Sequence, residues 1–174
     1  MILAEDEASL YLQPTTMAVW APVGQTPTVH ADPGRSKTNF YGTLNLETGT
    51  EIVMEASTMN ADTTAQYLNQ ILTTIPDRPI LLFWDHAPYH AGKPIRDLLA
   101  ANPRLEIMPF PVGAPELNPQ EHVWKATRRA VSHNHRMRRL PDLADRFKSH
   151  LTDHTFDSSF LDRYGYNAIC PMFK

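Results

Sequence analysis

Apolar runs alternate with helical patterns along this chain, and their order predicts a mixed α/β fold. The run Ile80–Trp84, preceded by Pro79, predicts a short strand buried on both faces. Alternating apolar positions predict strands over residues 39–46 and 51–55, joined by a hairpin turn, and residues 1–4 form the end of a first strand. These three strands should form an antiparallel meander, and Ile80–Trp84 should lie parallel to a strand already in the sheet.

Helical spacing of apolar residues predicts four helices. The first begins at a cap supplied by Asn60 or Asp62, and its apolar positions are Ala65, Leu68, Ile71, Leu72 and Ile75. The later elements are a helix over residues 92–101, a strand over 105–110, a helix that Asn118 caps and Pro119 begins, and a helix from 141 or 142 to 151.

Three stretches lack a regular pattern. Ala8–Val29 is expected to be an irregular excursion with one short strand over residues 17–20, Ala31–Arg35 a turn, and Asp157–Lys174 a tail without periodicity. The chain has no internal repeat, low-complexity segment or interdomain linker. All 174 residues are therefore expected to belong to one domain, long enough to bury a core.

Composition narrows the class of protein. Hydrophobic residues make up 42% and charged residues 20%, as is usual for a globular domain. The single cysteine, Cys170, excludes an internal disulfide and suits a reducing compartment. It is interpreted as a packing residue. No apolar run approaches the roughly 18 residues of a membrane span, and no signal peptide is visible, so an intracellular protein without membrane contact is expected. The motifs of serine hydrolases, phosphate-binding loops and dinucleotide-binding folds are missing.

Positive charge is concentrated in one segment, although the whole chain carries −3. Residues 125–148 hold eight basic and two acidic residues, a balance of +6, which leaves −9 for the remainder. Clustered arginine and lysine attract nucleic-acid phosphates regardless of base sequence; a solvated helical face is the alternative. The residues expected to contact nucleic acid are Lys125, Arg128, Arg129, Arg136, Arg138 and Arg139.

Three acidic residues far apart in the sequence stand where predicted elements begin or end. Asp85 follows the strand Ile80–Trp84, Asp6 follows the first strand, and Glu121 lies near the start of the third helix. Ligands collect at the carboxyl ends of strands in open α/β sheets, and hard cations prefer carboxylate oxygens. The three are therefore expected to form one metal cluster, although Asp85 also suits a simple turn.

The other two acids have alternatives as well. Glu121 stands three positions after Asn118, where a glutamate can close a capping box instead of binding metal. Glu116, in the preceding loop, competes with it and ranks second as a ligand. Glu5 and Glu7 flank the first acid, but alternation along a strand places both on the opposite face.

Two histidines four residues apart, His86 and His90, suggest zinc. Pro88 between them makes a helical ligand pair unsuitable, and no cysteine or further histidine block completes a tetrahedral set. We expect His90 to orient its loop by hydrogen bonding. Trp84 and Trp124 are interpreted as core residues in preference to base-stacking ones.

Two blocks resemble the signatures of a known family. They are Trp84–His90, which reads Trp-Asp-His-Ala-Pro-Tyr-His, and Pro115–Trp124, which reads Pro-Glu-Leu-Asn-Pro-Gln-Glu-His-Val-Trp. They are similar to DDE superfamily endonucleases, the catalytic domains of mariner-like and bacterial insertion-sequence transposases, whose blocks typically read Asp-Asn-Ala-Pro-x-His and Ser-Pro-x-Leu-Asn-Pro-x-Glu. Thirty-five residues separate Asp85 from Glu121, close to the family's spacing.

The resemblance extends from the first residue to at least Trp124. A weaker block, Asp6 followed by Trp20–Gly24, resembles the family's first catalytic block. Two positions depart from the pattern: His86 stands where asparagine is usual, and Ala114 where serine is usual. The imidazole of His86 can still form a hydrogen bond near a phosphate.

The resemblance implies an RNase H-like fold, with the antiparallel meander and parallel strands in one sheet flanked by helices. It implies that Asp6, Asp85 and Glu121 are catalytic and hold two Mg²⁺ ions, with Mn²⁺ as a substitute, supported by His86, His90 and Asn118. Two such ions, roughly 3.5–4 Å apart, activate the attacking oxygen and stabilise the leaving one. The implied reaction is hydrolysis of a DNA phosphodiester, followed by attack of the freed 3′-hydroxyl on target DNA.

The implied partners are transposon-end and target DNA and a second copy of the chain, in the bacterial cytoplasm at the nucleoid. Family members carry helix-turn-helix domains ahead of this core, whereas this chain begins almost at Asp6, so weak or non-specific DNA affinity is expected. The alternatives are a stand-alone or domesticated RNase H-like nuclease and an inactive nucleic-acid-binding or assembly module. Metal-dependent nicking separates the enzymes from the module, and joining of a 3′ end separates a transposase from a nuclease.

Overall fold

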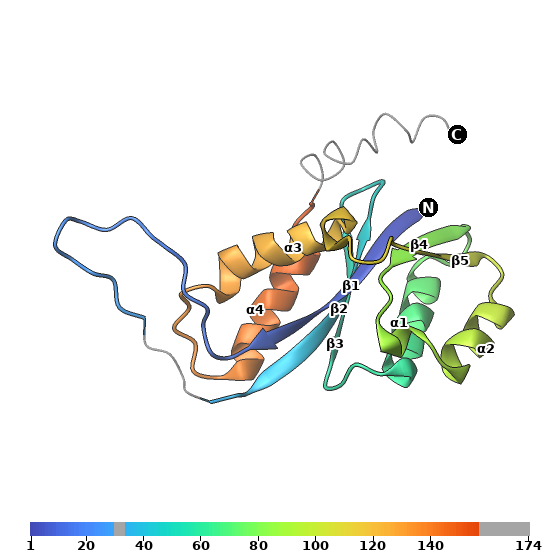
Figure 1. Cartoon of the computed structure of the whole chain (residues 1–174), viewed down its shortest axis with the longest axis horizontal. Helices are drawn as coiled ribbons and strands as arrows, with labels where there is room; N and C mark the ends of the chain where they lie inside the picture. The colour runs from blue at the N-terminus through green and yellow to red at the C-terminus, as the bar shows by residue number, and fades with distance from the viewer. Residues whose placement is uncertain (30–33, 157–174) are drawn as a thin grey trace.

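The central strand of the sheet is β1 (Ile2–Tyr11), and the strand order is β3-β2-β1-β4-β5 (Figure 1). The computed structural model describes residues 1–29 and 34–156. β2 (Lys37–Asn45) pairs antiparallel with β1, and β3 (Glu51–Ala56) pairs antiparallel with β2. β4 (Ile80–Trp84) and β5 (Leu105–Pro109) lie parallel to β1 on its other side. The predicted meander with added parallel strands is confirmed.

The first strand is much longer than predicted. β1 does not end at Ala4 but continues through the acidic residues 5–7 to Tyr11, paired with β2 from Leu3 onward. The prediction treated the acidic run as the end of the strand. In the structure the side chains of Asp6 and Glu7 have hydrogen-bond partners in Trp124 and His90, and the backbone of these residues stays in the sheet. Asp6 therefore lies in the middle of a strand and not at its end.

Helices cover both faces of the sheet (Figure 1). α1 (Ala61–Thr74) and α2 (Lys93–Ala101) lie on one face, and α3 (Gln120–Thr127) and α4 (Leu140–Asp153) on the other. Asn60 caps α1 as predicted, since its side chain accepts from the N–H of Asp62 and Thr63. The connections include 3₁₀ turns η1 (Pro88–His90) and η2 (Pro115–Leu117) and a π-helical turn η3 (Arg128–Ser132), which the apolar pattern did not predict.

Each face of the sheet has its own hydrophobic core. The core under α1 and α2 includes Tyr41, Tyr67 and Leu82, and the core under α3 and α4 includes Phe40, Trp124 and Phe147. In β4 the first, third and fifth residues are buried, whereas the second and fourth are half-buried. The prediction that this strand is buried on both faces is therefore correct for one face only.

α3 packs unusually close to β2 at Gly42. A Cβ atom at this position would lie 2.5 Å from Cη2 of Trp124 and 2.6 Å from Nε2 of Gln120, closer than carbon and nitrogen atoms can approach. Gly42 stands opposite Asp6 in the register of β1 and β2. The missing side chain thus lets the Trp124 ring lie across the sheet beside Asp6.

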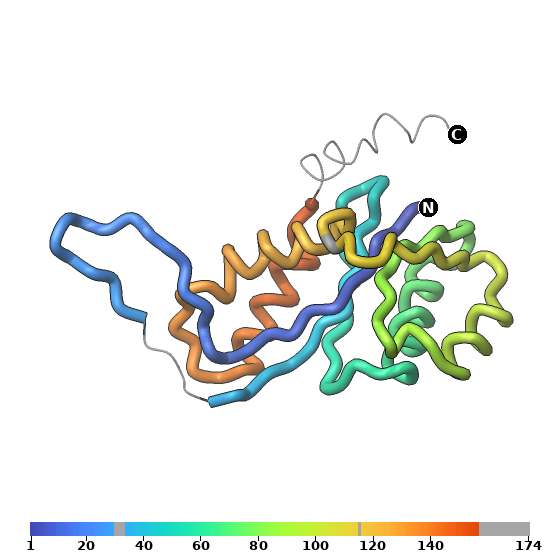
Figure 2. The backbone as a smooth tube through the Cα atoms, viewed as in Figure 1, coloured from blue at the N-terminus to red at the C-terminus, as the bar shows by residue number. Residues whose placement is uncertain are grey.

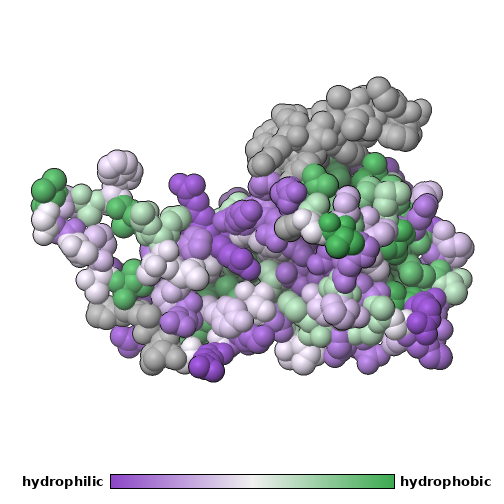
Figure 3. Space-filling view, viewed as in Figure 1, coloured by the Kyte–Doolittle hydropathy of each residue, from purple (hydrophilic) through white to green (hydrophobic). Residues whose placement is uncertain are grey.

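Between β1 and β2 the chain leaves the sheet as a long arm (Figure 2). The base of the arm is fixed by Asn134, whose side chain accepts from the Met17 N–H at 3.0 Å and donates to the Met17 carbonyl at 2.9 Å. The predicted strand over residues 17–20 is wrong: none of these residues lies in a strand, and the backbone of Met17 pairs with the Asn134 side chain. Large apolar side chains are exposed along the arm, namely Val19, Trp20 and Val23. Hydrophobic and hydrophilic residues alternate on its surface in Figure 3.

The later elements follow the prediction with small shifts. α3 begins one residue later than expected, with Pro119 as its cap, and α4 extends to Asp153.

No helix in the described part of the chain is long and apolar enough to cross a membrane. The tail Asp157–Lys174, with Cys170, and residues 31–33 of the predicted turn lie outside the described residues.

Candidate active site

Asp6, Asp85 and Glu121 line one cavity of about 300 Å³. Asp6 comes from the middle of β1, Asp85 follows β4, and Glu121 lies in the first turn of α3. The other lining residues belong to the loops after β4 and β5 and to the start of α3: His86, Ala87, Phe110, Pro111, Val112, Gly113, Ala114 and Asn118. The three acids predicted as a cluster thus share one site, although they are separated by up to 115 positions of sequence.

Sheet register explains why Asp6 and Asp85 meet. β1 and β4 pair in parallel as far as Ala4 and Phe83. Asp6 and Asp85 each lie two residues beyond this last pair, where β4 ends and β1 continues beside β2. The carboxyl end of a parallel strand next to a longer neighbour opens into a crevice, so both carboxylates reach the same space.

Asp6 is surrounded by acidic and apolar groups. The indole N–H of Trp124 donates a hydrogen bond of 3.0 Å to Asp6 Oδ2. Burial, followed by repulsion from Glu121 and Glu7, raises the pKa of Asp6 from 3.8 to about 7, against the lowering effect of the Trp124 hydrogen bond. A cation in the cavity would offset this repulsion and favour the ionised carboxylate.

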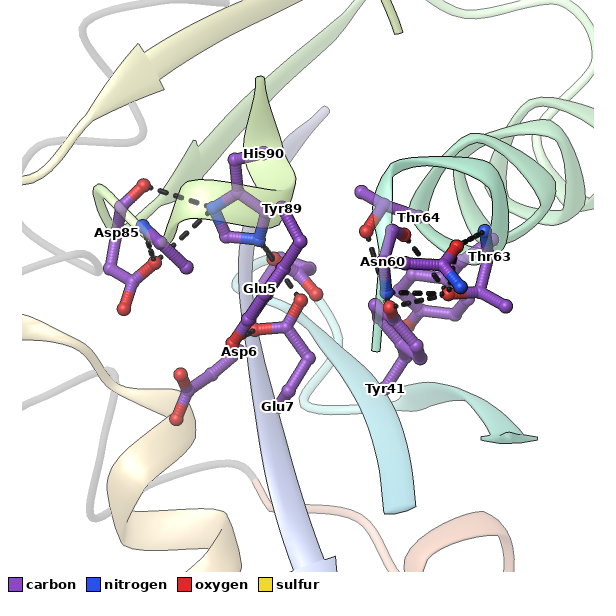
Figure 4. Close-up of polar contacts among 12 residues, drawn as sticks. Glu5, Asp6, Glu7, Tyr41, Asn60, Thr63, Thr64, Asp85, Tyr89 and His90 are labelled. Carbon is purple, nitrogen blue, oxygen red and sulfur yellow. Dashed lines mark hydrogen bonds and ion pairs between the residues drawn. The ribbon is translucent and has the colours of Figure 1, made fainter. Parts of the chain in front are cut away.

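Asp85 is held by its own loop. Its Oδ1 accepts a hydrogen bond of 2.8 Å from the Ala87 N–H. The Nδ1–H of His90 donates to the Asp85 carbonyl at 3.0 Å, and Nδ1 lies 3.2 Å from Oδ1 (Figure 4). His90 therefore orients this loop by hydrogen bonding, in the way expected from the sequence.

Asn118 ties the start of α3 to β1. Its side-chain amide donates to the Glu5 carbonyl at 3.1 Å, and its Oδ1 accepts from the Gln120 N–H at 3.1 Å. This buried contact places Glu121 next to Asp6. Asn118 therefore does more than begin a helix, because it also fixes the position of α3 on β1. The cap residue of α3 makes no side-chain capping bond, and Glu121 lines the cavity. Glu116 is exposed and is not among the lining residues.

His86 joins the two loops that frame the cavity. Its Nε2–H donates to the Phe110 carbonyl at 2.8 Å, so the loop after β4 is tied to the loop after β5. A histidine at this position thus has a structural partner, although asparagine is usual in the family that the sequence resembles.

Glu5 and Glu7 point to the face of β1 opposite to Asp6, as alternation predicted (Figure 4). Glu7 Oε1 lies 2.9 Å and Glu5 Oε2 3.6 Å from Nε2 of His90. Burial and then the charges of Glu7 and Asp6 raise the pKa of Glu5. Burial disfavours the imidazolium of His90, but the hydrogen bond and charge of Glu7 outweigh it and raise the pKa of His90.

The basic residues form no single helical face. Lys125 lies on α3, Arg128 and Arg129 lie in η3, and the others lie in the extended segment before α4. All except Arg128, which is half-buried, are exposed. They follow α3 away from Glu121, and the surface over α3 and the segment after it is largely hydrophilic (Figure 3).

The donor set fits a hard divalent cation. Three carboxylates converge on one cavity, and burial together with repulsion from Glu121 raises the pKa of Asp6. Mg²⁺ and Mn²⁺ prefer oxygen ligands and retain several waters, which a cavity of about 300 Å³ can hold. Asp6, Asp85 and Glu121 are therefore the residues that could hold such ions.

Comparisons with known proteins agree with this geometry. The family model described as "DDE superfamily endonuclease" matches residues 2–144. The "Insertion element IS630 uncharacterized 39 kDa protein" of Shigella sonnei is 24% identical over 135 residues, which cover 77% of this chain and 39% of that protein. The chain thus spans well under half the length of this relative.

Solved structures show the same fold. The Mos1 transposase paired-end complex with left transposon end superposes with a TM-score of 0.70 at 19% identity, covering 95% of this chain and 51% of that one. The mariner Mos1 paired end complex with Mg gives a TM-score of 0.69 at 19% identity, covering 97% and 54%. These similarities establish the RNase H-like fold expected from the sequence.

Proposed function

Because this chain belongs to the DDE superfamily of endonucleases, we propose that it is the catalytic core of a transposase that cleaves DNA and joins the cleaved end to a second DNA. The observation that carries the proposal is the cavity in which Asp6, Asp85 and Glu121 converge. The insertion-element relative and the Mos1 complex with a transposon end support DNA as the substrate. A bacterial chain with this activity would work at the nucleoid.

Asp6, Asp85 and Glu121 hold two Mg²⁺ ions in this proposal, with Mn²⁺ as a substitute. The bound ions supply Lewis acidity at the attacking and leaving oxygens of the phosphodiester. Trp124 holds the Asp6 carboxylate by its indole N–H, and His90 holds the loop of Asp85. Asn118 keeps Glu121 at the same cavity by fixing the start of α3 to β1. Each carboxylate thus has a neighbour that fixes its position before the ions bind.

The reaction proceeds in two displacements at phosphorus. Water attacks first, the P–O3′ bond breaks, and the 3′-oxygen leaves as a hydroxyl. That 3′-hydroxyl then attacks a phosphodiester of target DNA, forming one new P–O bond as another breaks. Two ends must be held together for this outcome, so we propose that two copies of the chain act on paired ends.

The proposal is tested with the chain, Mn²⁺ and a labelled DNA duplex. We expect nicking that requires the metal, and we expect a fraction of the labelled 3′ ends to be joined to a second DNA. Nicking without joining would favour a simple RNase H-like nuclease. Neither product at any metal concentration would contradict both enzymatic assignments and favour an inactive nucleic-acid-binding module.

Metal affinity should increase with pH up to about 7. Asp6 holds a proton below its pKa of about 7, and that proton competes with the cation. The apparent affinity for Mn²⁺ should therefore rise about tenfold per pH unit from pH 5 to 7 and then level off. Electron paramagnetic resonance of free Mn²⁺ measures this directly.

The control for this measurement is His86→Asn. His86 also lines the cavity, and asparagine replaces its imidazole with a neutral amide. The variant should keep the pH dependence if Asp6 causes it. An affinity that does not change with pH in the unmodified chain would contradict the assignment of Asp6 as a ligand.

DNA affinity should depend on the basic segment after α3. Replacing both Arg136 and Arg138 with glutamine removes two exposed charges. The slope of log K against log salt should fall by about 1.8, since each lost phosphate contact contributes about 0.9. Fluorescence anisotropy of a labelled duplex at several salt concentrations gives the slope. Arg96→Gln, an exposed arginine on α2, should leave it unchanged.

A further inference from the structure

A second cluster of metal-ligating side chains lies across β1 from the carboxylate cavity. Its members are Glu5, Glu7 and His90, and one ligand atom from each lies within 4.8 Å of the others (Figure 4). All three side chains are almost fully buried, at 4% exposure or less. The catalytic proposal above uses His90 only for its contact with the Asp85 loop, and it gives Glu5 and Glu7 no role.

The orientation of His90 leaves its Nε2 facing two carboxylates. The Asp85 carbonyl can only accept a hydrogen bond, so Nδ1 of His90 carries a proton and donates to it at 3.0 Å. Nε2 then lies 2.9 Å from Glu7 Oε1 and 3.6 Å from Glu5 Oε2. A lone pair aimed at two carboxylates is repelled, so a proton or a metal ion must lie between them.

A proton accounts for only part of this arrangement. A proton on Nε2 satisfies Glu7, but both carboxylate oxygens of Glu5 remain buried without a hydrogen-bond partner among the described residues. Two ionised carboxylates and one imidazolium also leave a buried charge of −1. A protonated Glu5 removes that charge, but its O–H then has no acceptor, and a buried unpaired polar group is costly.

A divalent cation satisfies all three groups together. Zinc binds imidazole nitrogen and carboxylate oxygen at roughly 2.0–2.2 Å, which places neighbouring ligand atoms roughly 3.0–3.5 Å apart, close to the 2.9 and 3.6 Å found here. Glu5 Oε1 is also unpartnered and supplies a fourth donor. The charge of such an ion cancels that of the two glutamates.

The surroundings of the cluster are those of a metal site. A metal-binding histidine usually donates its other N–H to a carbonyl, as His90 does to Asp85. The hydroxyl of Tyr89 donates to Glu7 Oε2 at 3.2 Å, which orients this carboxylate as well. An imidazole nitrogen among the donors selects Zn²⁺ or Co²⁺ over Mg²⁺, in contrast to the all-oxygen cavity.

We propose that Glu5, Glu7 and His90 form a separate site for a borderline divalent cation such as Zn²⁺, distinct from the carboxylate cavity of Asp6, Asp85 and Glu121. The ion binds His90 Nε2 and thereby fixes Nδ1–H on the Asp85 loop. The second site thus stabilises the position of Asp85 and takes no part in the displacement at phosphorus.

The test measures Zn²⁺ retained by the whole chain after dialysis in excess Mg²⁺, which occupies the carboxylate cavity. We expect one Zn²⁺ per chain. Glu7→Gln and His90→Gln should each lose it, whereas Glu121→Gln, a change in the cavity, should keep it. No retained Zn²⁺, retention by Glu7→Gln, or loss in Glu121→Gln would each overturn the proposal.

A spectrum of the unmodified chain keeps the test independent of whether the variants fold. Co²⁺ in place of Zn²⁺ should give visible d–d absorption of a nitrogen- and oxygen-ligated ion that excess Mg²⁺ does not remove. Tyr89→Phe should weaken Zn²⁺ about 10-fold or more, since outer partners of metal ligands contribute that much. A Co²⁺ spectrum that Mg²⁺ abolishes would assign the metal to the cavity instead. None of these measurements involves DNA, so their outcome is separate from that of the proposed cleavage.

Discussion

Replacing Asp85 with asparagine should abolish metal-dependent DNA cleavage and leave the fold intact. We expect a loss on the order of 10³-fold or more, about 4 kcal/mol of transition-state stabilisation, because an amide lacks the charge that holds the cations. The side chain is 52% exposed, so little core packing changes. Asparagine also keeps an oxygen that accepts from the Ala87 N–H. Conversion of supercoiled plasmid to the nicked form measures the loss.

The matched control is Asp97→Asn. Asp97 is an exposed aspartate on α2 that pairs with Lys93, and it lies outside the cavity. This variant should cleave like the unmodified chain, and both variants should unfold within a few degrees of it. Cleavage that survives in Asp85→Asn would remove the basis for placing the active site in this cavity.

Sequence patterns predicted the fold well where the signals were local. The apolar run of β4, the hairpin between β2 and β3 and the cap of α1 each depend on residues close together in sequence. The length of β1 could not be predicted in this way. Three consecutive acids usually end a strand, whereas here β1 continues beside β2, with Glu7 and Asp6 bound to the distant residues His90 and Trp124.

The candidate site was predicted in part. Asp85 and Glu121 stand in two blocks typical of the family. Asp6 was chosen because it follows the predicted first strand and belongs to a weaker block. The roles of Trp124 and Asn118 as neighbours of the carboxylates depend on how α3 crosses β1, which no periodicity reveals. The same holds for the buried cluster around His90. Alternation along the strand did place Glu5 and Glu7 on one face, and this was the sequence signal that pointed to the cluster.

Replacing Trp124 with alanine should be among the most destabilising single changes in the chain. Its side chain is 1% exposed, packs against Phe147 and fills the space that Gly42 leaves open. Removing a buried tryptophan costs about 3–5 kcal/mol through lost transfer energy and the cavity left behind. Urea denaturation of the variant and the unmodified chain gives the difference in the free energy of unfolding.

Trp20→Ala is the matched control for this prediction. Trp20 lies fully exposed on the arm, so its replacement should change the free energy of unfolding by less than about 0.5 kcal/mol.

Trp124→Phe separates packing from the contact with Asp6. Phenylalanine retains most of the apolar surface but lacks the indole N–H, which lowers the pKa of Asp6. This variant should therefore be more stable than Trp124→Ala but bind Mn²⁺ more weakly at pH 7, because the pKa of Asp6 rises. Equal Mn²⁺ affinity in Trp124→Phe and the unmodified chain would limit Trp124 to a packing role.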